Sequence, residues 1–226
     1  MKQRNSRHFN IFYKPNSLAE KEIGFITVAL EKSFAFIIKK LALSDNFPKI
    51  NYYLYPDNNS KFRAMGDKGN ANARIKQFAI HGIYNKKIKI VGRHEIVHLL
   101  TNKWGKSPEL LRQGLAEAME EKWHKINHHQ WAKNFRKNKK LIALKDLLDD
   151  KKFWQFDDLI TYPESGSFVK YLIDCCGLKL FKRLYKKLHY NLSAKQKEKI
   201  IKTIISKPLK ELEKDWLDYV KIKNEI

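Results

Sequence analysis

Apolar residues recur at helical spacing along the N-terminal part of the chain. Residues 17–20 (SLAE) have the composition of a helix-capping box, and apolar positions then repeat every three to four residues over 23–41. Charged residues such as Glu31 and Lys32 interrupt this stretch, and charges at the centre of a membrane span are costly. We therefore expect a long, buried helix in a folded core and no membrane span.

Three short segments that follow have the β-branched and aromatic composition of strands. They are residues 50–56 (INYYLYP), 80–84 (IHGIY) and 87–91 (KIKIV), with a turn at residues 85–86 and a breaker at Gly92. We expect them to form a small mixed sheet between about residues 48 and 91.

Helical periodicity returns after these strands and continues to the C-terminus. Four apolar positions give residues 93–103 one apolar face. The sequence Ser107-Pro108-Glu109 is a typical helix start, with a capping serine, a proline at the first helical position and an acid in the first turn. It predicts a helix at about 108–124, so the expected fold class is α+β with a helical C-terminal half.

The length of 226 residues suits one substantial core, and no low-complexity linker divides the chain. We expect residues 1–16 to be a polar N-terminal extension and residues 17–226 to be a single domain. Within that domain, 17–103 would hold the long helix, the sheet and the next helix, and 104–226 the helical half. The extension lacks the apolar core of a signal peptide, which favours the cytoplasm.

One segment specifies chemistry, because His94-Glu95-Ile96-Val97-His98 has H-E-x-x-H spacing within the helix expected at 93–103. Side chains four apart lie on the same face of a helix, so the two imidazoles can bind one Zn²⁺ ion. Glu95 can then act as the general base on the metal-bound water. Catalytic zinc sites usually have three protein ligands, so a third ligand is expected downstream.

The helix expected at 108–124 contains the sequence QGLAEA at residues 113–118. Together with the H-E-x-x-H helix, it resembles the gluzincin metallopeptidases of the bacterial peptidase MA-like group. In that family a second helix of the type E-G-L-A-E-Y provides the third zinc ligand through its first glutamate. The resemblance implies a zincin-like fold and a zinc-dependent peptidase.

The third ligand has two candidates under this resemblance. By local alignment the ligand position carries Gln113, and an amide oxygen is a neutral, weaker ligand than a carboxylate. Glu117 would then accept a hydrogen bond from a zinc-bound imidazole. By separation, Glu117 lies 19 residues after His98, as the ligand does in gluzincin aminopeptidases, and would itself bind the metal.

Two later segments are similar to the same family. Residues 162–177 resemble the tyrosine-to-glycine helix in which the tyrosine stabilises the oxyanion, which implies that role for Tyr162. The alternative for Tyr162 is a helix-entry residue that packs on the core. Residues 206–216 resemble the closing helix of the family, with Trp216 in the core.

Composition adds the question of nucleic-acid binding, because 46 Lys and Arg against 24 Asp and Glu give a net charge of +22. The lysines are spread over all the expected helices without a recognisable binding module. We therefore expect a solvated basic surface and do not favour nucleic acid as a partner. We expect His124, His128 and His129 at this surface, and Cys175 and Cys176 to be reduced and packed in a helix.

These observations favour a zinc-dependent metallopeptidase whose substrate is a peptide or protein. The substrate is expected to add to the strand at 87–91 as an extra strand, in a cleft between the sheet edge and the helical half. Because of Gln113, the alternative is a non-catalytic, metallopeptidase-like binding protein.

Overall fold

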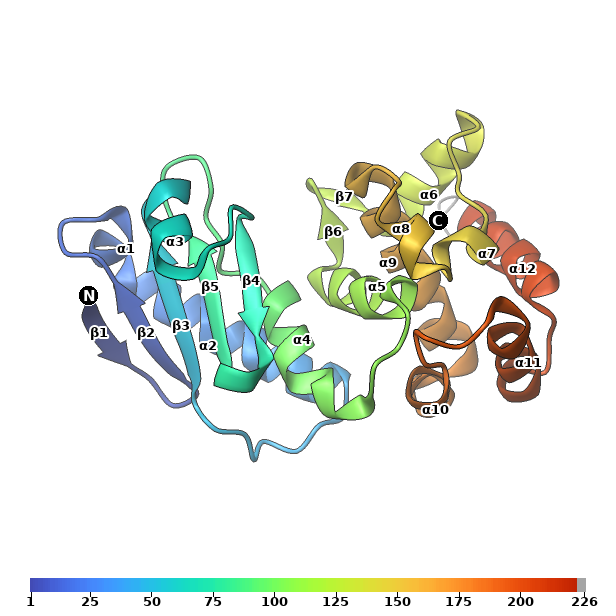
Figure 1. Cartoon of the computed structure of the whole chain (residues 1–226), viewed down its shortest axis with the longest axis horizontal. Helices are drawn as coiled ribbons and strands as arrows, with labels where there is room; N and C mark the ends of the chain where they lie inside the picture. Colours follow the sequence, from blue (N-terminus) through green and yellow to red (C-terminus); the bar gives the residue numbers. More distant parts are fainter. Residues whose placement is uncertain (223–226) are drawn as a thin grey trace. The chain divides into compact units, whose positions relative to one another are not determined.

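The computed structural model describes residues 1–222, which belong to two compact units (Figure 1). The first unit is Met1–Asn102, and the second is Lys103–Ile226, described up to residue 222. A small mixed sheet with helices forms the first unit, and the second is mostly helical. The expected α+β class is therefore confirmed.

The sheet of the first unit has five strands in the order β1-β2-β3-β5-β4. β2, β3 and β5 are parallel, and β1 and β4 pair antiparallel at the two edges. Residues 1–16, expected to be an extension, contribute β1 and β2 to this sheet, and β2 also contributes to the core of the unit. Phe9, Ile11 and Tyr13 alternate with less buried residues, which buries one face of β2. The strands span Lys2–Asn5 (β1), Phe9–Tyr13 (β2), Ile50–Tyr55 (β3), Ala71–Arg74 (β4) and Ala79–Ile83 (β5).

The long helix expected at the N-terminus forms in two parts. α1 (Leu18–Lys21) begins after Ser17, whose Oγ accepts the Glu20 amide hydrogen at 3.3 Å. α2 (Ile23–Lys40) follows directly and packs against β2. No helix within residues 1–222 is both long and apolar enough to cross a membrane. The buried side of α2 consists of Ile26, Leu30, Phe34 and Ile37.

A third helix, α3 (Asn58–Met65), connects β3 to β4. Asp57 caps its first turn by accepting the Ser60 amide hydrogen at 2.7 Å. The helix ends at Gly66, which adopts the left-handed conformation with φ 71° that ends many helices. α3 packs against β3 and β5, the two strands next to the edge strand β4.

Residues 87–91 do not add a strand to the sheet, so that part of the sequence prediction is wrong. An isolated bridge joins Tyr84 to Lys89. The side chain of Asn85 closes this tight turn by accepting two backbone amide hydrogens at 2.9 and 2.8 Å. The edge of the sheet opposite β1 belongs to β4 instead.

The second unit is a helical assembly with one short hairpin. The helix expected at about 108–124 is α5 (Glu109–Glu120), and it ends earlier because Glu121 is left-handed, with φ 68°. The other helices are α6 (His128–Lys137), α7 (Leu144–Leu147), α8 (Asp150–Phe153), α9 (Asp158–Cys176), α10 (Leu178–Lys187), α11 (Ala194–Ile205) and α12 (Leu209–Ile222), with the hairpin β6 (Lys122–Trp123) and β7 (Ile126–Asn127).

Two glycines allow close packing of α5, α6 and α9. A Cβ atom on Gly114 would lie 2.5 Å from the Ser165 carbonyl oxygen, and one on Gly166 would lie 2.6 Å from the His128 ring. Both distances are too short for any larger residue without movement of the backbone or of a buried ring. Trp216 on α12 is fully buried in the same unit, in agreement with its expected place in the core.

Candidate metal centre

The two histidines of the H-E-x-x-H motif lie on one face of α4 (His94–Thr101). Their Nε2 atoms are 3.1 Å apart. Two imidazoles that bind one tetrahedral zinc ion at about 2.0–2.1 Å place their nitrogens about 3.3 Å apart. The pair therefore has the separation that two ligands of one zinc ion require.

Packing fixes the orientation of this histidine pair. The helix buries its apolar residues, including Ile96, Val97, Leu99 and Leu100, while both imidazoles stay half-buried. α4 lies beside β4 in the first unit, as Figure 1 shows, and contacts this strand and β5. The expected helix at 93–103 is thus confirmed, and its polar face lies at the open edge of the sheet.

Glu95 is half-buried and lies next to this edge. Burial raises the pKa of its carboxyl above the ordinary value. His94, the backbone amide of Ala73 and the ammonium of Lys61 act in the opposite direction, because each favours the charged carboxylate. A general base works best when its pKa lies near the working pH. A carboxyl whose pKa is raised above the ordinary value therefore suits this role.

The Ala73 amide is directed toward Glu95 by the register of β4. The amide of Ile83 donates to the carbonyl of Asn70 at 3.0 Å, so residues 70, 72 and 74 face β5. The backbone groups of Ala71 and Ala73 consequently point to the open side of the strand. There the Ala73 amide is close enough to stabilise the charge of Glu95.

Lys61 also belongs to this neighbourhood, although no sequence pattern identifies it. It is fully buried on α3, and its ammonium donates to Asp67 Oδ1 at 3.0 Å and to Asn72 Oδ1. Its charge also acts on Glu95. A lone lysine in a polar segment carries no sequence signal for burial, so only the packing of α3 on the sheet identifies it.

The two candidates for the third ligand lie one turn apart on α5 in the second unit. Glu117 is 1% exposed, and its Oε2 lies 3.1 Å from Nε2 of His128. Gln113 is also buried and donates from Nε2 to Glu109 Oε2 at 2.9 Å. Both side chains are thus held in defined orientations by neighbours in their own unit.

Tyr162 lies near the start of α9 in the second unit and is half-buried. Its ring centroid is 5.6 Å from that of Trp123 and 6.5 Å from that of Phe153. The ring therefore packs among aromatic side chains. This agrees with the alternative prediction that Tyr162 is a helix-entry residue that packs on the core. Its proposed role toward an oxyanion stays a prediction.

The structure brings His94, Glu95 and His98 together within the first unit. Gln113, Glu117 and Tyr162 lie on the packed helices α5 and α9 of the second. Within residues 1–222, no group of three or more His, Cys, Asp or Glu side chains is arranged to hold a metal ion. The histidine pair fits two zinc ligands, and the third ligand stays a prediction.

Two histidines expected at the surface are buried instead. His128 is fully buried and His129 is 3% exposed, because α6 begins at His128 and packs against α9. Nδ1 of His129 lies 2.9 Å from Ser167 Oγ, so this ring belongs to the core. His124 is exposed in the turn between β6 and β7, as expected.

The two adjacent cysteines are free thiols at the end of α9. Cys175 is exposed and Cys176 is half-buried. The expected reduced state is consistent with this position, but only Cys176 is partly packed. Burial raises the pKa of the Cys176 thiol above its ordinary value.

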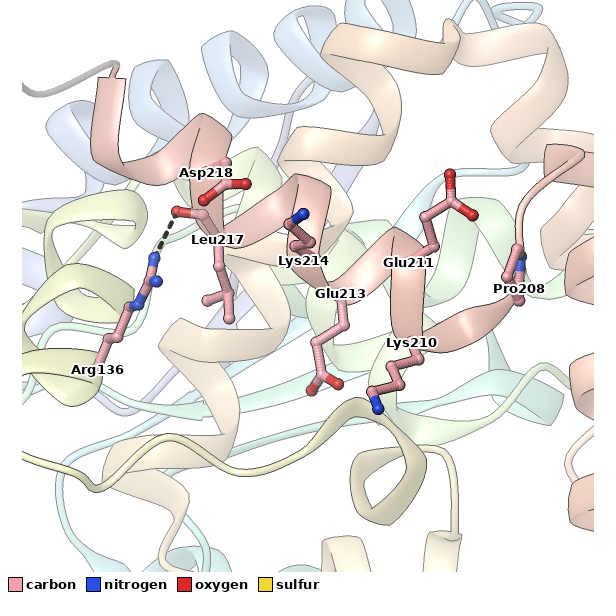
Figure 2. Close-up of a pocket in the computed structure, with 8 residues that line it drawn as sticks. All are labelled: Arg136, Pro208, Lys210, Glu211, Glu213, Lys214, Leu217 and Asp218. Atoms are coloured by element: carbon pink, nitrogen blue, oxygen red, sulfur yellow. Dashed lines mark hydrogen bonds between the residues drawn. The ribbon is translucent and has the colours of Figure 1, made fainter.

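Two grooves on the second unit are lined by residues other than the candidate metal-site residues. One, of about 560 Å³, lies along α12 beside Arg136 of α6, which donates to the Leu217 carbonyl at 3.1 Å (Figure 2). The other, of about 850 Å³, is lined by residues of the α7–α8 region and the α10–α11 loop, including Trp154 and Tyr190. Neither groove is lined by a residue that the sequence assigned to the metal site.

Comparison with known proteins adds no relative from which residue roles could be transferred. No model of a protein family matches the chain, and no curated protein matches its sequence. The arguments for a function of this chain therefore rest on its own residues and on the geometry described above.

Proposed function

We propose that this protein is a zinc-dependent metallopeptidase. The observation that carries the proposal is the 3.1 Å separation of the His94 and His98 Nε2 atoms, with Glu95 on the same helix at the open edge of β4. This combination is the minimum that H-E-x-x-H chemistry needs: two metal ligands and one carboxylate that can move a proton.

Three residues of the first unit have separate roles in the proposed reaction. His94 and His98 would hold the zinc ion, which when bound polarises the substrate carbonyl and lowers the pKa of water. Glu95 accepts the proton of the attacking water at its carboxylate oxygen. It then delivers that proton to the nitrogen of the leaving amine.

The open edge of β4 is the proposed binding place for the substrate backbone. Ala71 directs its amide and carbonyl to this side and Ala73 directs its carbonyl there, so an extended peptide can pair with β4 as a further strand while the Ala73 amide stays with Glu95. This proposal replaces the strand at 87–91, which does not form. It also brings the substrate backbone alongside Glu95, because the Ala73 amide lies close to that carboxylate.

Glu117 is the preferred candidate for the third ligand within this proposal. A carboxylate that binds a metal is usually fixed by a further hydrogen bond, and His128 would fix Glu117 in this way. Gln113 is the alternative ligand, through its amide oxygen. Tyr162 is proposed, from the family resemblance, to stabilise the oxyanion.

One observation favours a second candidate function, a non-catalytic binding protein on the same scaffold. Glutamine stands at residue 113, where the family resemblance leads us to expect a glutamate. A protein that lacks the third carboxylate ligand would bind zinc weakly. It would retain an open strand edge that can still bind an extended peptide.

Hydrolysis of a mixed peptide library by the zinc-loaded protein tests the proposal. Glu95→Gln should keep the bound zinc and lose turnover, while Glu198→Gln, an exposed glutamate on α11, should behave as wild type. A wild-type protein that binds zinc and library peptides without cleaving them would support the non-catalytic alternative. Equal cleavage by wild type and Glu95→Gln would contradict the assignment of Glu95.

A further inference from the structure

Lys61 is a fully buried lysine close to Glu95, the proposed general base. Lysine is almost never fully buried unless its charge is paired, because desolvation of an ammonium group is costly. The first partner of Lys61 is Asp67, at 3.0 Å from its Nζ atom. The second is the side-chain oxygen of Asn72. A surface-directed lysine would avoid this cost, so the buried arrangement calls for an explanation.

The contacts of Lys61 connect α3 to the strand at the open edge. Asp67 lies in the loop between α3 and β4 and also accepts the Gly69 amide hydrogen at 2.8 Å. Asn72 lies on β4 itself and pairs with His81 of β5. One ammonium group therefore holds both the loop that leads into β4 and the strand.

Asn72 is the direct neighbour of Ala73, whose amide stabilises the charge of Glu95. A shift of Asn72 along or away from the sheet would move the Ala73 amide with it, because one peptide unit joins the two residues. The charge of the Lys61 ammonium also reaches Glu95 and His81. Lys61 thus contacts β4 through the Asn72 side chain, one residue from the Ala73 amide.

We infer that Lys61 is a positioning residue for the proposed peptidase reaction. Its ammonium, paired with Asp67, holds Asn72 and thereby sets the place of β4 and of the Ala73 amide relative to the Glu95 carboxylate. Lys61 does not touch the substrate in this account. The inference rests on the proposed function, and its structural half, the control of Ala73 by Lys61, can be measured without any turnover.

The test compares two lysines of the same unit in the full-length protein. Lys61→Met removes the ammonium and keeps the apolar stem, whereas Lys68→Met removes an exposed lysine from the α3–β4 loop. Hydrogen exchange at the Ala73 amide, followed by NMR, should become about tenfold faster or more in Lys61→Met and stay unchanged in Lys68→Met. Zinc content should be the same in both, because neither lysine touches His94 or His98.

The kinetic arm separates positioning from stability. In zinc-loaded protein well below its unfolding temperature, Lys61→Met should lower kcat about tenfold or more, since small displacements of catalytic groups are costly. Lys61→Arg should restore part of this loss because it keeps the charge. A purely structural lysine would lower the unfolding temperature and leave kcat of the folded molecules unchanged, which would overturn the inference.

A second variant keeps the inference testable if Lys61→Met does not fold. Asn72→Ala removes the link on the strand side and leaves Lys61 paired with Asp67, so it should reproduce the faster exchange at Ala73 and the lower kcat. Wild-type exchange and wild-type kcat in Asn72→Ala would overturn the inference. If wild-type protein hydrolyses no peptide, the proposed function fails, and the exchange measurement alone still decides whether Lys61 controls Ala73.

Discussion

The Nε2 atoms of His94 and His98 lie 3.1 Å apart on the polar face of α4. At this distance one neutral imidazole can donate its Nε2 hydrogen to the other Nε2 atom, or both nitrogens can bind one cation. Their spacing agrees with two ligands of one zinc ion, and the apolar side of the helix holds it in place by packing. The chemistry proposed for the chain starts from this pair.

Removal of either imidazole should abolish stoichiometric zinc binding. His98→Ala leaves one histidine of the pair, and a single imidazole is not sufficient to retain zinc during purification. His124→Ala is the matched control, because His124 is exposed in the β6–β7 turn. Metal analysis of purified protein should find one zinc ion per chain in wild type and in the control. Full zinc content in His98→Ala would exclude the pair as ligands.

The two candidates for the third ligand predict opposite results. If Glu117 binds zinc, Glu117→Gln should weaken zinc binding about tenfold or more, and Gln113→Ala should have little effect. If Gln113 is the ligand, Gln113→Ala should weaken binding, and Gln113→Glu should strengthen it because a carboxylate replaces an amide. Competition with a chelator of known affinity measures both.

The direction of the Ala73 amide can be tested with proline. Ala73→Pro removes an amide hydrogen that points away from the sheet, so the sheet should persist while kcat falls about tenfold or more. Arg74→Pro removes an amide that faces β5 and should destabilise the fold by about 1–3 kcal/mol, because a ladder hydrogen bond is lost. Equal stability of the two variants in urea unfolding would contradict the register argument.

Gly114 should not tolerate a side chain. Its added Cβ would meet the Ser165 carbonyl oxygen at 2.5 Å, so Gly114→Ala should destabilise the protein by about 2–3 kcal/mol. Gly24 on α2 has open space around it, and Gly24→Ala should stabilise by up to about 1 kcal/mol. Urea unfolding of both variants gives the comparison, and similar effects of the two substitutions would be inconsistent with close packing of α5 on α9.

Glu164 should make the fold less stable as the pH rises. Burial, and secondarily the charge of Glu213, raise the pKa of its carboxyl well above the ordinary 4.5. Below pH 4.5 the Glu164 carboxyl is protonated in both the folded and the unfolded chain. Above it the unfolded chain loses the proton first, so the folded state loses relative stability until the pH exceeds the raised pKa. Glu164→Gln should remove this decline, and an unchanged pH dependence in urea unfolding would contradict it.

The elements around the candidate metal site are largely predictable because they depend on local patterns. The apolar periodicity of 93–103 specifies α4. The residue types of H-E-x-x-H predict metal-binding chemistry for this helix. The strand at 87–91 was predicted wrongly because alternation alone cannot distinguish a sheet strand from a tight turn, and the side chain of Asn85 favours the turn.

The burial of polar side chains around the candidate site depends on tertiary packing, which no local sequence pattern encodes. Burial of Lys61 follows from the position of α3 on the sheet, and burial of His128 follows from the small size of Gly166 on α9. The start of the sheet at residue 2 was missed because β1 is exposed and polar. The sequence leaves two candidates for the third ligand, because local alignment favours Gln113 and the separation from His98 favours Glu117.

The central claim is that the imidazole pair binds the metal on which the proposed hydrolysis depends. The most direct test is a crystal structure of zinc-loaded protein with diffraction data on both sides of the zinc absorption edge. We predict one anomalous peak at about 2.0–2.1 Å from Nε2 of both His94 and His98. A zinc-loaded crystal with no peak at this pair, or with its zinc bound only elsewhere, would contradict the account.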